Sequence, residues 1–155
     1  MLPTRYFVVT GAGISTVSCL NAFDAALLAA GIGNYNLVPV SSILPADAQE
    51  VTPPDLPPGS IVYVVLARED CSSGEHAAAA IAWGFGSTPE GHRFGLVAES
   101  HGHCTLADIE QRALNRLREM ARVRRLRLES EQVRSAHVAP PIDHFGCAIA
   151  ALVLF

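Results

Sequence analysis

The feature that most constrains the fold of this chain is an uncharged apolar run at residues 147–154. A β-strand carries such a run only when both of its faces are buried, because a strand with one wet face alternates apolar and polar residues. We therefore expect these residues to form a central strand. This run and the other long apolar run, residues 77–86, are shorter than the ~20 residues that cross a bilayer, so we expect no membrane span.

Two stretches have the spacing of amphipathic helices. In residues 19–30 the apolar positions recur every three or four residues, with Ser18 or Asn21 as N-cap candidates and Gly31 as the stop. A longer helix is expected after Thr105, which begins a capping-box pattern with Asp at its fourth position. Its buried stripe is predicted at Ile109, Ala113, Leu117, Met120 and Ala121.

The other apolar segments favour strands. They are rich in β-branched or aromatic residues and bounded by glycine, proline or charged turns, and a loop is expected from Gly11 to about Ser18. The predicted strands are residues 6–10, 36–44, 61–66, 77–85, 94–100, 132–138 and 147–154. Residues 77–85 could also form a helix, which their alanines favour, but the alternation of Ile81, Trp83 and Phe85 and the neighbouring glycines favour a strand. The result is an α+β fold in a single domain, residues 1–155, whose helices cover antiparallel sheets.

The chain contains no lysine, since all eleven of its basic residues are arginine. Enzymes that hold pyridoxal phosphate (PLP), lysine aldolases and P-loop enzymes all use a lysine amine. These classes are therefore excluded, and we expect no PLP.

The four cysteines, Cys19, Cys71, Cys104 and Cys147, form no C-x-x-C pair. Neither a disulfide framework nor a cysteine-rich zinc module fits this spacing. We expect reduced thiols and a cytoplasmic protein, because the first ten residues also lack a secretory pattern.

Residues 9–15 place Gly11 and Gly13 directly after a predicted strand, as in loops that bind a dinucleotide phosphate. The third glycine of that fingerprint and the acidic residue that would bind the ribose are missing. An ordinary strand-to-loop turn is the favoured interpretation.

His101, His103 and Cys104 follow Glu99 closely and are potential metal ligands. No second cluster of histidine or cysteine would complete a zinc site, so a polar turn is favoured and we expect no metal.

Arginines are concentrated at residues 122–127, which is a pattern that can contact phosphate backbones. They lie at the end of a predicted helix, where cations complement the helix dipole, and the chain is acidic overall, with a net charge of -4. We expect no nucleic acid partner.

The strongest pattern runs through residues 21–45, where Asn21-Ala-Phe-Asp24 is followed by a glycine turn and then by Ser41-Ser42. This run resembles the processing region of the pyruvoyl-dependent arginine decarboxylases. The similarity extends to residues 95–99 and 145–148. It implies a four-layer αββα sandwich of antiparallel sheets that assembles as a homotrimer with active sites between subunits.

The resemblance also implies that the chain cleaves itself. The Ser42 hydroxyl would attack the Ser41 carbonyl, and the resulting ester would break to give residues 1–41 (β chain) and residues 42–155 (α chain). Ser42 would become a pyruvoyl group, the covalent cofactor. Asn36 is our candidate for stabilising the oxyanion of this attack.

In the mature enzyme the resemblance implies that arginine forms a Schiff base on the pyruvoyl group and loses CO2 to give agmatine. Glu99 matches the family's acidic residue and would donate the proton, with a pKa raised by burial. Asp24 matches the partner of the substrate guanidinium, which a carboxylate can bind through two hydrogen bonds. The stem of the substrate would be lined by Leu20, Leu27, Gly33, Tyr35, Ser41 and Ile43.

Two alternatives remain open. The chain could be an unprocessed trimeric protein that binds arginine or agmatine without reacting. It could also be a pyruvoyl decarboxylase for another amino acid, such as ornithine or histidine.

Overall fold

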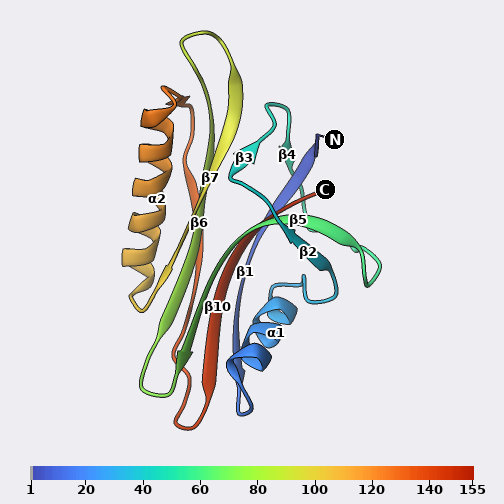
Figure 1. The fold of residues 1–155 in the computed structure, drawn as a ribbon, viewed down its shortest axis with the longest axis vertical. Helices are drawn as coiled ribbons and strands as arrows, with labels where there is room; N and C mark the ends of the chain where they lie inside the picture. The colour runs from blue at the N-terminus through green and yellow to red at the C-terminus, as the bar shows by residue number, and fades with distance from the viewer. Residues whose placement is uncertain (1) are drawn as a thin grey trace.

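The computed structural model describes residues 2–155 (Figure 1). Two helices and ten strands follow one another along the chain. In order, they are β1 (Arg5–Ser15), α1 (Cys19–Ala29), β2 (Asn36–Pro39), β3 (Ile43–Leu44), β4 (Gln49–Glu50), β5 (Ile61–Ser72), β6 (Ala77–Ser87), β7 (Arg93–Gly102), α2 (Leu106–Val123), β8 (Arg127–Leu128), β9 (Gln132–Val138) and β10 (Phe145–Leu154).

The first sheet has the strand order β2-β5-β10-β1-β4. Strand β10 lies at its centre and pairs antiparallel with both β1 and β5. Residues 146–154 are all buried, which explains why the run carries no charge. The prediction of a central strand is confirmed.

The second sheet contains β3, β7, β6 and β8 in that order, and β9 also pairs with β6. Strand β6 is a nearly continuous run of buried small residues with Trp83 among them. Small side chains let layers on both faces approach it closely. This supports the predicted strand at residues 77–85, and α2 packs on the same sheet.

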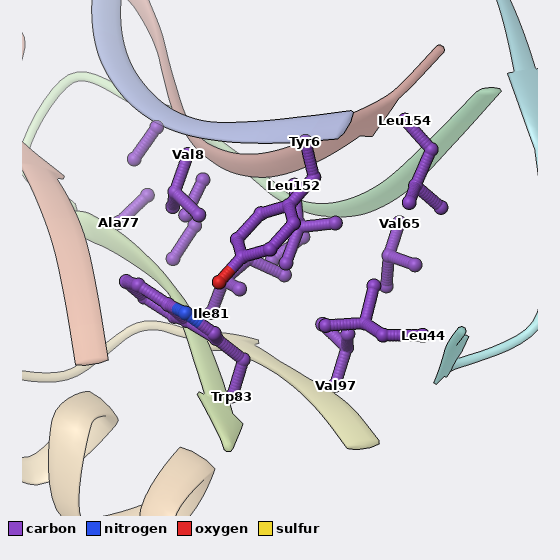
Figure 2. Packing of buried hydrophobic residues seen from close by; sticks show 14 of the residues in the cluster. Tyr6, Val8, Leu44, Val65, Ala77, Ile81, Trp83, Val97, Leu152 and Leu154 are labelled. Carbon is purple, nitrogen blue, oxygen red and sulfur yellow. The ribbon is translucent and has the colours of Figure 1, made fainter. Parts of the chain in front are cut away.

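The two sheets pack face to face over a shared apolar core (Figure 2). Tyr6, Val8 and Leu152 of the first sheet meet Ile81 and Trp83 of the second. Strands alternate their side chains, so the opposite face of each sheet is left for a helix.

Helix α1 covers the outer face of the first sheet and α2 that of the second (Figure 1). The molecule therefore has four layers in the order αββα. One part of the expectation is wrong: the first sheet is mixed, because β4 runs parallel to β1 and β2 parallel to β5. A parallel pair needs a long crossover, and the proline-rich connection between β2 and β5 is long enough to provide one.

The helix caps agree with the sequence. The Ser18 hydroxyl accepts a hydrogen bond from the Asn21 N–H, and the Thr105 hydroxyl accepts one from the Asp108 N–H. Gly31, with φ of 77°, follows α1 in the left-handed region that glycine tolerates.

Strand β1 extends to Ser15, so the predicted loop from Gly11 to Ser18 is wrong over most of its length. A Cβ atom on Gly13 would lie 2.2 Å from the Ala22 carbonyl oxygen, and one on Gly11 would lie 2.2 Å from that of Ala26. These two glycines let α1 lie directly on the strand. Both glycines therefore allow the helix to pack closely, although their pattern in the sequence indicates a turn.

Within residues 2–155 no helix combines the length and apolar character needed to cross a membrane.

Candidate active site

The chain passes from one sheet to the other at Ser41 and Ser42. Before them, β2 pairs with β5 of the first sheet, and the Val40 N–H donates to the Val64 carbonyl at 3.0 Å. After them, β3 pairs with β7 of the second sheet, and the Val97 N–H donates to the Ser42 carbonyl at 2.9 Å. The peptide bond between the two serines is therefore held from both sides by different sheets.

The backbone bends sharply at this crossing. The Ile43 N–H donates a hydrogen bond of 2.9 Å to the Ser41 carbonyl, two residues earlier in the chain. Such a bond defines a three-residue turn centred on Ser42.

Ser42 and Glu99 line the same cavity, which has a volume of about 380 Å³. The Val97 N–H that holds Ser42 lies two residues before Glu99 on the same strand, so both predicted catalytic residues lie at one edge of β7. Glu99 is exposed in the single chain. The burial expected to raise its pKa is therefore absent within one subunit.

Helix α2 contributes three residues to this cavity: Arg116 and Glu119, which the sequence did not single out, and Met120, which was predicted only as part of the buried stripe. An Arg116 N–H donates to the Glu99 carbonyl at 2.9 Å and so ties the helix to the edge of β7. Residues 116, 119 and 120 share one helix face by their spacing, which is the only sequence signal that groups them.

The negative charge that Glu119 brings to this cavity is partly compensated by its ion pair with an arginine. Arg122 donates two hydrogen bonds of 2.7 Å to Glu119. These bonds hold the pKa of Glu119 below its ordinary value, so this carboxylate is ionised at neutral pH.

Ser41 and Ile43 line a second, apolar cavity of about 470 Å³. Its walls include Val40, Tyr63 and Phe94. An apolar pocket beside the two serines suits the stem of an extended substrate.

The remaining predicted residues lie elsewhere in the subunit. Asp24, Leu20 and Leu27 belong to α1, where Asp24 and Leu20 are exposed and Leu27 is half-buried. Gly33 and Tyr35 line a separate cavity of about 190 Å³, where the Tyr35 hydroxyl donates to the Pro54 carbonyl at 3.1 Å. Neither of the cavities beside the two serines includes any of these five residues.

Asn36 lies at the start of β2, separated from Ser42 by the length of that strand. Its side-chain amide donates to the Gly59 carbonyl at 2.9 Å. In a single subunit this amide is therefore used to hold the connection before β5.

The two histidines considered above as metal ligands contact the carboxylate of Glu69. His101 Nδ1 lies 2.7 Å and His103 Nε2 3.3 Å from the two carboxylate oxygens of Glu69. Among residues 2–155 no three His, Cys, Asp or Glu side chains are arranged to hold a metal ion.

Comparison with known proteins covers the whole chain. A family model described as pyruvoyl-dependent arginine decarboxylase matches residues 5–155. A pyruvoyl-dependent arginine decarboxylase of Methanopyrus kandleri is 35% identical over 154 residues, which cover 99% of this chain and 98% of that protein. Enzymes of the same name from Pyrococcus abyssi and Methanothermobacter thermautotrophicus are 37% and 39% identical, over 88% and 86% of this chain and 85% of each relative.

Proposed function

Because the chain belongs to the pyruvoyl-dependent arginine decarboxylase family, we propose that it converts arginine to agmatine and CO2. The observation that best supports this is the Ser41–Ser42 bond at the crossing between the sheets, with Glu99 lining the same cavity as Ser42. A chain without lysine needs another carbonyl to engage the substrate amine, and cleavage at Ser42 creates one.

The chain's own residues account for that cleavage. The Ser42 hydroxyl oxygen bonds to the Ser41 carbonyl carbon, the hydroxyl proton passes to the Ser42 nitrogen, and the peptide C–N bond breaks to leave an ester. Loss of the Ser42 α-proton then forms a Cα=Cβ double bond and breaks the Cβ–O bond, which expels Ser41 as a carboxylate and leaves residue 42 as dehydroalanine. A proton shift to Cβ gives the imine, water adds to its carbon, and the nitrogen leaves as ammonia, so that residue 42 is left with a ketone.

The residues around position 42 fit a pyruvoyl group. The carbonyl of Ser42 already accepts the Val97 N–H, and a cavity of about 380 Å³ opens beside it. When formed, the group supplies a ketone that condenses with the substrate amine and accepts the electrons released with CO2. Glu99 donates the proton that replaces CO2, and Arg116 holds the backbone of Glu99 in place.

The proposed substrate contacts require more than one subunit. Asp24 pairs with the substrate guanidinium in this proposal, yet it shares no cavity with Ser42 in the single chain. A homotrimer with sites between subunits would let α1 of one subunit approach β3 and β7 of its neighbour. Exposed apolar side chains on α1 and on β3, the elements that would meet, support such an interface. Leu20 of α1 is 69% exposed and Ile43 of β3 is 43% exposed.

In the assembled site Leu20, Leu27, Gly33, Tyr35 and Ile43 contact the stem of the substrate. Asn36 reaches the oxyanion only if assembly frees its amide from Gly59. The proposal also retains a cytoplasmic location, with which four unpaired thiols are compatible.

The proposed activity can be tested with arginine labelled at its carboxylate carbon. We expect labelled CO2 and agmatine in equal amounts, and borohydride added with arginine should increase the mass of the fragment that begins at residue 42. The Ser42→Ala variant should give neither result. Binding of arginine without release of CO2 by the wild-type protein would favour the non-catalytic alternative, and faster turnover of ornithine or histidine would favour another substrate.

A further inference from the structure

Resting on the self-cleavage proposed above, we infer that the main-chain N–H of Ile43 stabilises the oxyanion formed on Ser41 during that reaction. This donor lies 2.9 Å from the Ser41 carbonyl oxygen while the Ser41–Ser42 bond is still intact. It is therefore in contact with the atom that gains charge before the reaction begins.

The Ile43 N–H is available for this role because the strand ladder does not use it. Donors and acceptors on a strand point alternately to its two sides. The carbonyl of Ser42 points toward β7, where it accepts the Val97 N–H. The N–H of the next residue, Ile43, therefore points away from β7 and back to Ser41.

Both ends of the turn are anchored, which keeps the donor in place. Val40 is bonded to Val64 in the first sheet, and Ser42 is bonded to Val97 in the second. The turn between them has little freedom to open, so the donor is preorganised at no further cost when charge develops.

The charge arises in the first step of cleavage. As the Ser42 oxygen bonds to the Ser41 carbonyl carbon, the electron pair of the C=O bond moves onto the Ser41 oxygen. The same pair returns to reform C=O when the C–N bond breaks and the nitrogen takes the hydroxyl proton. A hydrogen-bond donor to this oxygen therefore lowers the energy barriers both to formation and to breakdown of the tetrahedral intermediate.

Asn36, the donor expected from the sequence, cannot fill this role within one subunit because its amide is bonded to Gly59. The turn at Ser42 provides a donor from the reacting chain itself. Cleavage therefore depends on the local backbone in addition to any residue that assembly brings near.

Cleavage of freshly synthesised protein tests the inference without any substrate. The Ile43→Pro variant removes the N–H, whereas Ile43→Ala keeps it and shortens the same side chain. Conversion of the 155-residue chain into fragments of 41 and 114 residues is followed by mass. We expect Ile43→Pro to cleave more slowly than Ile43→Ala by roughly 10²–10³, the usual effect of losing one oxyanion donor.

A backbone ester provides the second variant, in case proline disturbs folding. Ile43 is replaced during cell-free synthesis by the corresponding α-hydroxy acid, which keeps the side chain, removes the N–H and changes the Ser42 carbonyl from an amide to an ester. Cleavage of this variant at the wild-type rate would overturn the inference, whereas slowing by at least about tenfold would support it. If the wild-type chain itself does not cleave, the proposed function fails, and this outcome is distinct from rapid cleavage of both the wild-type and the ester variant.

Discussion

The main-chain N–H of Val97 donates a hydrogen bond of 2.9 Å to the carbonyl oxygen of Ser42. This contact joins two segments that are distant in the sequence, the serine pair and the strand that carries Glu99. It fixes Ser42 at the edge of β7, where the cavity shared with Glu99 opens. The proposed cofactor position and the proposed proton donor are thereby set by one ladder of backbone hydrogen bonds.

Replacing Glu99 with glutamine removes the carboxyl proton and keeps the shape of the side chain. We expect Glu99→Gln to lower kcat by about 10²–10⁴, the usual contribution of a general acid, while cleavage at Ser42 proceeds. The measurement is agmatine release together with intact mass. The matched control is Glu90→Gln, in the turn after β6, which should retain wild-type kcat. Full activity of Glu99→Gln would remove this residue from the mechanism.

Two inactive variants should restore activity when they are co-expressed, if the site lies between subunits. Asp24→Ala and Glu99→Gln then leave one intact site wherever a wild-type Asp24 faces a wild-type Glu99. Random mixing predicts about a quarter of wild-type activity at low arginine concentration. Each site needs an intact Asp24 from one subunit and an intact Glu99 from its neighbour, and each of these is present with a probability of about one half.

The control for that experiment is co-expression of Ser42→Ala with Glu99→Gln. These residues line one cavity of the same subunit, so no mixed site is complete and no activity should return. Equal recovery in both mixtures, or recovery in neither, would contradict a shared site.

The close contact between β1 and α1 predicts a large effect from a small substitution. A Cβ atom on Gly13 would lie 2.2 Å from the Ala22 carbonyl oxygen, so Gly13→Ala must push the helix away. We expect a loss of about 1–3 kcal/mol, and a fall in Tm of roughly 3–10 °C. In Gly102→Ala the added Cβ meets the end of the long Arg112 side chain at 3.3 Å and the Cys104 sulfur at 3.9 Å, an ordinary contact distance, and this control should melt near the wild-type temperature. Equal Tm values for both variants would refute the packing role of Gly13.

An ion pair beneath α1 predicts a pH-dependent contribution to stability. Partial burial by itself raises the pKa of Asp70, but the hydrogen bonds from Arg68 at 3.0 and 2.8 Å, a hydrogen bond from Cys147 and the positive charge of Arg68 together bring the pKa below the ordinary value of 3.8. A lowered folded-state pKa gives stability that is present above the ordinary value and lost as the pH falls through the folded value.

Thermal melts of Asp70→Asn test this effect. At pH 7 the variant should melt on the order of 2 °C below the wild type, and the gap should narrow as the pH falls below the ordinary pKa of 3.8. The exposed Asp47→Asn variant serves as the control. A gap that stays constant across this range would contradict the ion-pair explanation.

Most of the fold could be predicted from the sequence because its signals are local. Ser18 and Thr105 cap helices where the pattern placed them, and β9 has the predicted bounds. The prediction ended strand β1 too early, at residue 10, because a glycine is found equally well in a turn and at a close contact with a helix. The two-residue strands β4 and β8 are too short to produce any periodic signal. The single strand predicted at residues 36–44 is divided into β2 and β3, which belong to different sheets.

The site was only partly predictable for a different reason. Ser42 and Glu99 meet at one cavity as expected, but Arg116 reaches it from α2 because of how the helix crosses β7, which periodicity does not encode. Asp24 lines neither cavity beside the two serines in the single chain, and in our proposal it reaches the site through contacts between subunits. Such contacts leave no pattern in a single chain other than exposed apolar residues such as Leu20.

Intact mass of the purified protein is the most direct test of the central claim that the chain cuts itself between Ser41 and Ser42. We predict two components, residues 1–41 ending in a carboxylate and residues 42–155 with a ketone in place of the amino terminus, and no second product in Ser42→Ala. A single 155-residue chain that remains uncleaved after long incubation and does not react with borohydride would contradict the account.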